Sequence, residues 1–135
     1  MRFEGFSLLP AHLLSTSPPD MEDLQALSAH LGYMQRYVHW WLGDMALHAE
    51  AMWGDDWCQA IPEGLSSNLL ERCAGVSRNY PVERRFIDLS WSHHVIALRI
   101  KDLKKRNSLL QRASSESMST KDFSALVTKE RSHHG

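Results

Sequence analysis

Residues that are apolar except for His48 recur every three or four positions from residue 24 to residue 52, the spacing of one face of an α-helix. Asp20 precedes this pattern as an N-cap candidate, and acidic residues follow at positions 22 and 23, where the helix dipole favours negative charge. We therefore predict a long helix that begins near residue 20 and ends at Trp53–Trp57. Gly32 and Gly43 lie inside it at a cost of about 1 kcal/mol each relative to alanine, which allows a kink or a break.

The apolar positions alternate in steps of three and four, as in the a/d seam of a coiled coil. The seam residues that we predict to form a dimer interface are Leu24, Leu27, Leu31, Met34, Val38, Trp41 and Met45. Two interpretations remain open, a helix that packs on its own domain and a helix that pairs with a second copy. Trp41, and Trp91 further along the chain, take inward positions, and we expect both to be buried.

Residues 58–78 have the spacing of a helix-turn-helix unit: a short helix at 58–61, a turn at Pro62–Gly64 and a second helix at 68–78 capped by Ser66 or Ser67. The apolar face of the second helix is formed by Leu65, Leu69, Cys73 and Val76. The opposite face is formed by Asn68, Arg72, Gly75 and Asn79, with Glu71 and Arg78 beside it.

The rest of the chain also predicts helices. They are a short one at Val82–Ile87, one capped by Ser90 with Trp91, Val95 and Leu98 inward, one over Leu103–Ala113 capped by Asp102, and a last one opened by Ser119 and Asp122. No segment alternates like a strand, and residues 1–19 are expected to be irregular. The predicted fold class is all-α, a helical bundle with a long N-terminal helix and a helix-turn-helix-like unit. We expect an arm (1–19), one domain (20–130) with an acidic half (20–57) and a basic half (58–130), and a frayed tail (131–135).

The charge is divided unevenly along the 135 residues. Residues 1–63 carry two basic and nine acidic side chains, a net charge of −7, and residues 64–135 carry thirteen basic and seven acidic ones, a net charge of +6. Such asymmetry indicates a polyanion partner for the basic half, or an attraction between the two halves inside the fold.

Duplex DNA is the polyanion that the motifs favour. Short polar side chains at the start of a helix suit phosphates or base edges, arginine suits guanine or phosphate, and glutamate accepts from cytosine N4. Arg84, Arg85 and a basic run at 99–106 add possible phosphate contacts. The candidate DNA-binding residues are Ser66, Ser67, Asn68, Glu71, Arg72, Arg78, Arg84, Arg85, Arg99, Lys101, Lys104, Lys105 and Arg106.

Other classes of protein find little support in the sequence. Cys58 and Cys73 form no metal-binding motif and indicate reduced thiols in a cytoplasmic protein. His93 and His94 are adjacent and would point about 100° apart on a helix, so they cannot chelate one ion together. No nucleotide-binding or hydrolase motif is present, and no apolar run is long enough to cross a membrane. We expect no enzyme, no metal and no cofactor.

Three segments carry a resemblance to a known group. Trp40–Asp44 (WWLGD) with Glu50, then Gly64-Leu65-Ser66 through Val76, then Leu89–His94 (LSWSHH) resemble uncharacterised DNA-binding proteins of phages, plasmids and actinobacteria. The stretch Leu89–Val127 is also similar to the helical N-terminal domain of a bacterial PD-(D/E)XK nuclease family. The chain ends where the catalytic domain of that family would begin, so the resemblance implies a DNA-binding or adaptor module without nuclease activity.

These observations lead to one prediction and one alternative. The prediction is a non-enzymatic DNA-binding protein, a small transcription regulator of a phage or other mobile element, with a homodimer as one of its two open arrangements. The alternative is a protein-binding adaptor or inhibitor that acts through the acidic face of residues 20–56.

Overall fold

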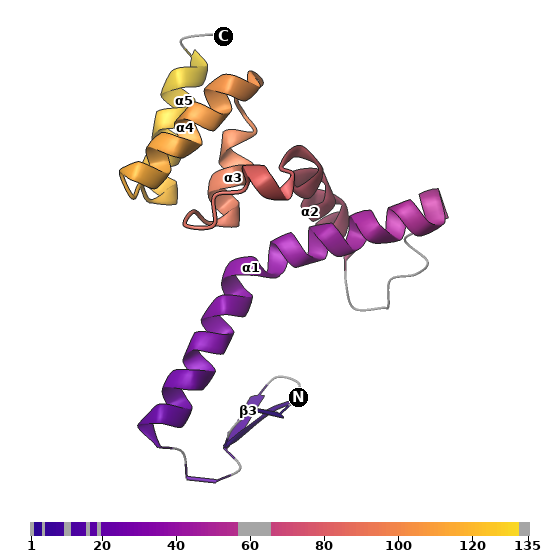
Figure 1. Cartoon of the computed structure of the whole chain (residues 1–135), viewed down its shortest axis with the longest axis vertical. Coiled ribbons are helices and arrows are strands. Elements are labelled where there is room, and N and C mark those ends of the chain that lie inside the picture. Colours follow the sequence, from indigo (N-terminus) through magenta and orange to yellow (C-terminus); the bar gives the residue numbers. More distant parts are fainter. Residues whose placement is uncertain are drawn as a thin grey trace. The chain divides into compact units, whose positions relative to one another are not determined.

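The computed structural model describes residues 2–3, 5–9, 12–15, 17–18, 20–56 and 66–132 (Figure 1). These ranges are mostly helical, as predicted. Their five α-helices are α1 (Met21–Trp53), α2 (Ser67–Asn79), α3 (Trp91–Ala97), α4 (Leu103–Ser115) and α5 (Thr120–Ser132), and a short 3-10 helix, η2 (Val82–Arg84), precedes α3. The short helix predicted at 58–61 lies outside the described residues.

The chain divides into two compact units, Met1–Tyr37 and Val38–Gly135. The boundary lies inside α1, since this helix extends from Met21 to Trp53. The helix continues without a break through Gly32 and Gly43. The division thus differs from the boundary that we expected between residues 19 and 20.

The first unit contains a small antiparallel sheet, so the prediction of an irregular arm without strands is wrong. The strands β1 (Arg2–Phe3), β2 (Phe6–Leu9) and β3 (His12–Ser15) pair in sequence order, with Phe3 opposite Phe6 and Leu9 opposite His12. Gly5 has a φ of +77°, a conformation that tight hairpin turns favour. Among the described residues of this unit, the buried apolar side chains are Phe6 and Leu27.

The start of α1 forms as the sequence predicts. The Asp20 carboxylate accepts a hydrogen bond from the Asp23 N–H at 2.8 Å, and this satisfies one of the free donors of the first turn. At the other end Gly54 takes a φ of +60°, which glycine adopts without strain.

In the second unit, α1 and α2 approach closely because α1 presents small residues to α2. Ala46 and Ala49 form a buried cluster with Leu70 and Ala74. Gly43 lies so close to α2 that a Cβ atom at this position would collide with Ser77 and with the backbone of Cys73. The glycine that we considered a weak point of the helix is therefore a packing position.

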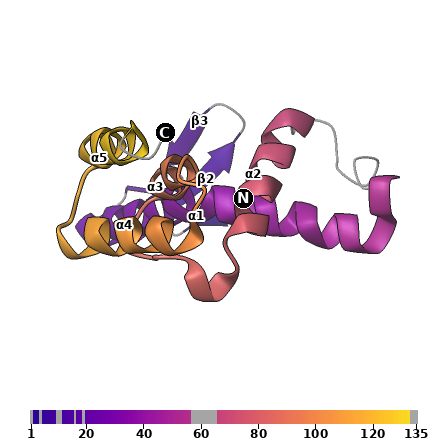
Figure 2. The ribbon, with the colours of Figure 1, turned by 90° about the horizontal axis from the view of Figure 1, so that it is seen from above.

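The remaining helices pack around α3, which contacts both α4 and α5 (Figures 1 and 2). Their predicted N-caps are confirmed: Ser90 accepts from the His93 N–H, Asp102 from the Lys104 N–H and Ser119 from the Asp122 N–H. Phe123 and Val127 of α5 are completely buried.

Two details differ from the prediction. Only Val82–Arg84 of the expected helix at 82–87 forms, as a 3-10 turn, because Arg85 is extended and the Phe86 N–H donates to the His94 ring. Arg131 belongs to α5 and is not part of a frayed tail, while residues 133–135 lie outside the described ones.

We predicted that both Trp41 and Trp91 are buried, and this prediction is correct for one of them only. Trp91 is buried, as expected, whereas Trp41 is 45% exposed. The inner face of α1 is occupied by glycine and alanine, which leaves Trp41 on the outer face. Of the predicted dimer seam, Leu24, Leu31 and Met45 are also exposed, Met34 and Val38 are partly buried, and Leu27 is buried inside the first unit.

Candidate functional site

The outward face of α2 forms one wall of the candidate site. Ser66 caps the helix by accepting a hydrogen bond from the Leu69 N–H, so its hydroxyl already has a structural role. The buried face contains Leu70, Cys73 and Ala74, rotated slightly from the predicted one. Burial also raises the pKa of the Cys73 thiol, which favours the neutral form of this core residue. The predicted polar face remains at the surface.

A groove of about 560 Å³ lies along this polar face. Its second wall is the segment from Val95 to Lys101, at the end of α3 and the start of the connection to α4, and Arg131 of α5 also lines it. The charged and polar groups of the groove are Glu71, Arg72, Asn79, Arg99, Lys101 and Arg131. Four cations and one carboxylate thus converge from separate elements of the second unit.

Among the described residues, the four groove cations have no ion-pair partner. In the part of the chain that the structure describes, no carboxylate lies within ion-pair distance of Arg72, Arg99, Lys101 or Arg131. Arg99 does donate a hydrogen bond to the Ser124 hydroxyl at 3.2 Å, which positions it without changing its charge. The groove therefore combines positive charge with exposure to solvent, and this arrangement attracts anions.

Arg72 is held in place by an aromatic side chain. Its guanidinium carbon lies 5.6 Å from the ring centroid of Trp91, within the range of a cation–π contact. On α1, His39 stacks on Trp91, with ring centroids 4.5 Å apart and planes at 19°. Because Trp91 is buried, Arg72 rests on a rigid support and loses less side-chain entropy when it binds a ligand.

Arg85, also a candidate for DNA binding, has a structural role instead. Its guanidinium forms two hydrogen bonds with the Asp44 carboxylate, at 2.8 and 2.9 Å, and a third with the Tyr80 carbonyl at 2.8 Å. It also lies 4.4 Å from the centroid of the Trp40 ring. The Arg85 hydrogen bonds lower the pKa of Asp44 although partial burial opposes them, which keeps the carboxylate ionised.

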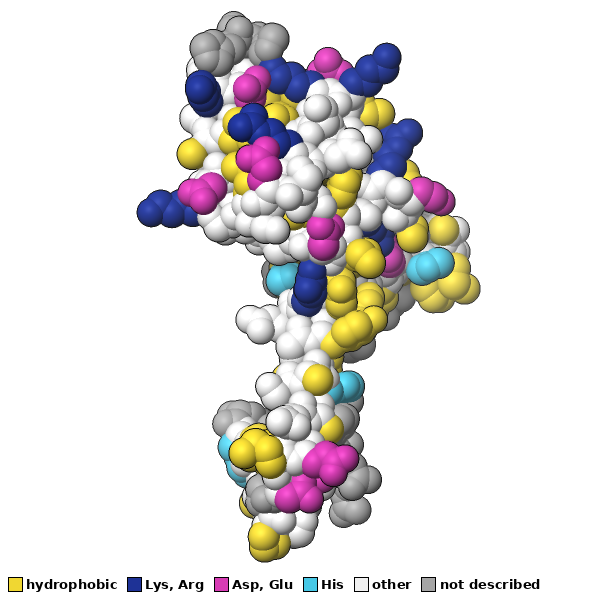
Figure 3. All heavy atoms as spheres, turned by 60° about the vertical axis from the view of Figure 1, so that its left-hand side comes forward, with side chains coloured by type: hydrophobic (Ala, Val, Ile, Leu, Met, Phe, Trp, Pro, Cys, Tyr) yellow, Lys and Arg dark blue, Asp and Glu magenta, His cyan; other side chains and the backbone are white. Residues whose placement is uncertain are grey.

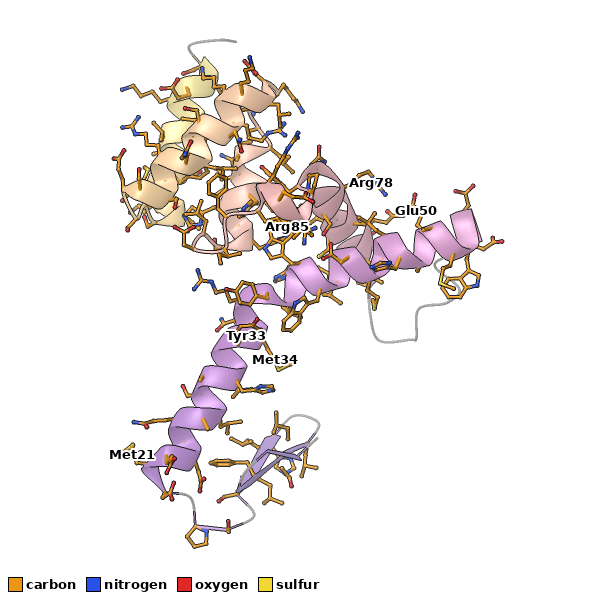
Figure 4. The ribbon with its side chains drawn as sticks, viewed as in Figure 1. Met21, Tyr33, Met34, Glu50, Arg78 and Arg85 are labelled. Carbon is orange, nitrogen blue, oxygen red and sulfur yellow. The ribbon has the colours of Figure 1, made fainter. Side chains whose placement is uncertain are left out.

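Arg78 and Glu50 form a second link between the two halves of the chain, at 2.8 Å, and point toward each other from α2 and α1 (Figure 4). Together with the pair of Arg85 and Asp44, this link shows that part of the charge asymmetry is used inside the fold. The sequence left this interpretation open, and it is confirmed for these two pairs.

The other candidate residues lie away from the groove. Arg106 is buried and donates to the Ile100 carbonyl at 2.9 Å, and Lys105 forms an ion pair with Glu130 at 3.2 Å. Their contacts inside the fold argue against the phosphate contacts that we expected of them. The remaining candidates, Ser67, Asn68, Arg84 and Lys104, are exposed but do not line the groove.

His93 and His94 stabilise the start of α3. The His93 Nδ1 accepts from the Ser90 N–H at 3.1 Å, which completes a capping box, and its Nε2–H donates to the Met118 carbonyl at 2.8 Å. The fully buried His94 donates from Nδ1 to the Ser90 carbonyl and accepts at Nε2 from the Phe86 N–H. Sequence reasoning considered this pair only as metal ligands and missed its role in the fold.

Two residues of the groove were missed or undervalued. We assigned Arg131 to a frayed tail and regarded Asn79 only as a member of the polar face of α2. In the structure, the Asn79 amide donates a hydrogen bond to the Gly75 carbonyl at 2.8 Å. No local pattern identifies Arg131, because it reaches the groove only when α5 folds back on α3.

Two searches of the described residues give no candidate. No three histidine, cysteine, aspartate or glutamate side chains among them converge as a metal site would require. None of their helices combines the length and the apolar character needed to cross a bilayer. Comparison of the chain with protein-family models, with curated proteins and with solved structures finds no match.

Proposed function

We propose that this chain is a non-enzymatic DNA-binding protein whose groove holds the phosphate backbone of double-stranded DNA. The observation that carries the proposal is the set of four cations, Arg72, Arg99, Lys101 and Arg131, which face one groove without a carboxylate partner among the described residues. Lysine and arginine at such a surface release counterions from DNA, and this supplies most of the non-specific affinity.

In this proposal the two walls of the groove make different kinds of contact with DNA. Arg99 and Lys101 both lie in the connection between α3 and α4, and they suit contacts to phosphate. The exposed face of α2 suits the major groove, where an α-helix fits and where base edges can be distinguished. Arg72 would then donate to guanine O6 and N7, and Glu71 would accept from cytosine N4.

The wider role follows from the motifs of the sequence. In this proposal α2 is the second helix of a helix-turn-helix unit, and residues 58–61, outside the described ones, complete the unit. The resemblance to phage, plasmid and actinobacterial DNA-binding proteins supports a small transcription regulator of a mobile element.

The alternative of an acidic protein-binding surface loses part of its basis. Asp44 and Glu50 are among the nine acidic residues of the N-terminal half, and both are paired with arginines of the basic half. The acidic charge that is available to a partner is smaller than the sequence suggests, so we favour the basic groove as the functional surface.

A titration of the full chain against a fluorescently labelled duplex at several salt concentrations tests the proposal. The double variant Arg99→Ala/Lys101→Ala should weaken binding to all duplexes alike and reduce the salt slope by roughly two, since each neutralised phosphate releases close to one counterion. Arg72→Ala should cost about 1–3 kcal/mol on the preferred site and reduce the preference among sequences.

Lys121→Ala provides the matched control, because this lysine of α5 is exposed and does not line the groove. Its effect should be small, and all variants should show the circular dichroism of the wild type. Wild-type protein that binds no duplex at low salt would contradict the proposal. So would a double variant that binds like Lys121→Ala.

A further inference from the structure

In the second unit, α1 buries Trp40 but leaves three other large apolar side chains at the surface. Small residues, Gly43, Ala46 and Ala49, face α2, whereas Trp41 is 45% exposed, Met45 38% and Met52 72%. We call Trp41, Met45 and Met52 the apolar stripe.

The members of the apolar stripe are separated by four and seven positions, so they lie on one face of the helix. Hydrophobic side chains also lie at the surface of the face shown in Figure 3. An aromatic ring flanked by flexible methionines is typical of a docking surface, because the ring provides a large contact area and the thioethers adapt to a partner. An exposed apolar face of this kind on a helix of a folded unit indicates an interaction site.

We infer that a second copy of this chain covers the apolar stripe, and that the two copies of α1 pair about a two-fold axis. The stripe lies on the a and d positions of the heptad seam, and two helices with the same seam are complementary to each other. A two-fold contact requires the same patch on both copies, and a single repeating stripe satisfies this requirement.

The charges beside the apolar stripe favour a second copy over a charged partner. Between residues 38 and 53 the aspartate, glutamate, lysine and arginine residues are Asp44 and Glu50, and the histidines are His39 and the exposed His48. Both carboxylates are paired within the chain, with Arg85 and Arg78. Two identical faces can therefore approach without strong repulsion. A partner of opposite charge would instead have to compete with ion pairs that already exist.

Sedimentation of the full chain without DNA tests this inference independently of the proposed function. The wild type should reach twice the monomer mass of 15.5 kDa in the micromolar range. Met52→Glu and, separately, Met45→Glu place a carboxylate on both facing surfaces. Like charges across an interface cost several kcal/mol, so each variant should raise the dissociation constant about 100-fold.

Met21→Glu is the matched control, because it makes the same chemical change at a 69% exposed position at the start of α1 that belongs to the first unit and not to the apolar stripe. This variant should sediment like the wild type. Since Met52 is largely exposed, Met52→Glu decides the outcome even where Met45→Glu alters folding. A wild type that remains at 15.5 kDa at high micromolar concentration, or a Met52→Glu variant that dimerises like the wild type, overturns the inference.

Discussion

Acidification should destabilise the second unit through one buried histidine. The His94 side chain is fully buried, and its ring donates from Nδ1 to the Ser90 carbonyl at 2.8 Å and accepts at Nε2 from the Phe86 N–H at 3.1 Å. These two bonds require the neutral ring with its proton on Nδ1. Burial lowers the pKa of His94 to about 4, although the Ser90 carbonyl opposes the shift.

The size of the effect follows from the two pKa values. In the unfolded chain a histidine titrates near pH 6.5, whereas folded His94 titrates near 4. Between these values the unfolded state binds a proton that the folded state does not, so the free energy of unfolding falls as the pH falls. The loss should be about 2 kcal/mol between about pH 7 and pH 5, and about 3 kcal/mol below the folded pKa.

Urea unfolding at several pH values above about 5 measures this loss, and the window avoids the titration of Asp44, whose pKa is lowered from 3.8. The variant His94→Gln should be less stable than the wild type at neutral pH but should lose much less stability on acidification. His48→Gln replaces an exposed histidine and should keep the wild-type pH dependence. The reasoning is refuted if the wild type loses less than about 0.5 kcal/mol in this window, or if His94→Gln loses as much as the wild type.

Two further predictions concern packing and are tested by the same urea measurements. Gly43→Ala should destabilise the protein by about 1–3 kcal/mol, because the new Cβ atom meets the backbone of Cys73. Gly32→Ala has open space around it and should stabilise α1 by up to about 1 kcal/mol, so equal effects of the two variants would contradict the assigned packing. Trp91→Ala should cost about 3–5 kcal/mol, and Trp41→Ala markedly less because Trp41 is exposed; a small loss at Trp91 would mean that the faces of α3 are wrongly assigned.

The helix ends were predictable because their signals are local. Asp20, Ser66, Ser90, Asp102 and Ser119 each accept a backbone N–H of the helix that they open. An N-cap needs only a short polar side chain within three residues of a free donor, so one segment of sequence contains all the necessary information.

The sheet of the first unit could not be predicted from alternation. All four residues of β3 are exposed, including the neighbours Leu13 and Leu14, so the strand has no apolar and polar face to recognise. The sequence signal for these strands was the short distance along the chain between pairs of apolar residues. The Gly5 turn fits that spacing, but Glu-Gly is a weaker hairpin signal than Asn-Gly or Asp-Gly.

The heptad seam predicted the helix correctly, but it led us to assign the wrong face of the helix to the core. Periodicity shows that apolar residues share a face, but it does not show whether that face meets the same chain or a second one. Here the part of α1 that packs on α2 presents Gly43, Ala46 and Ala49, because a Cβ atom at Gly43 would collide with α2. Small residues carry little weight in an apolar pattern, and Trp41 was therefore assigned to the core.

The candidate site required tertiary information of a different kind. The sequence offered nine of the thirteen basic residues of the C-terminal half as candidates without ranking them, and the structure distinguishes them by their partners. Arg78 and Arg85 pair with carboxylates 28 and 41 positions away, and Arg106 is buried against a backbone carbonyl. Such contacts neutralise a cation or remove it from water. Some residues of the basic run at 99–106 therefore line the groove, whereas others are held inside the fold. Arg99 and Lys101 remain available for an anion, and they lie beside Arg72 and Arg131 because α2, the α3–α4 connection and α5 line the same groove.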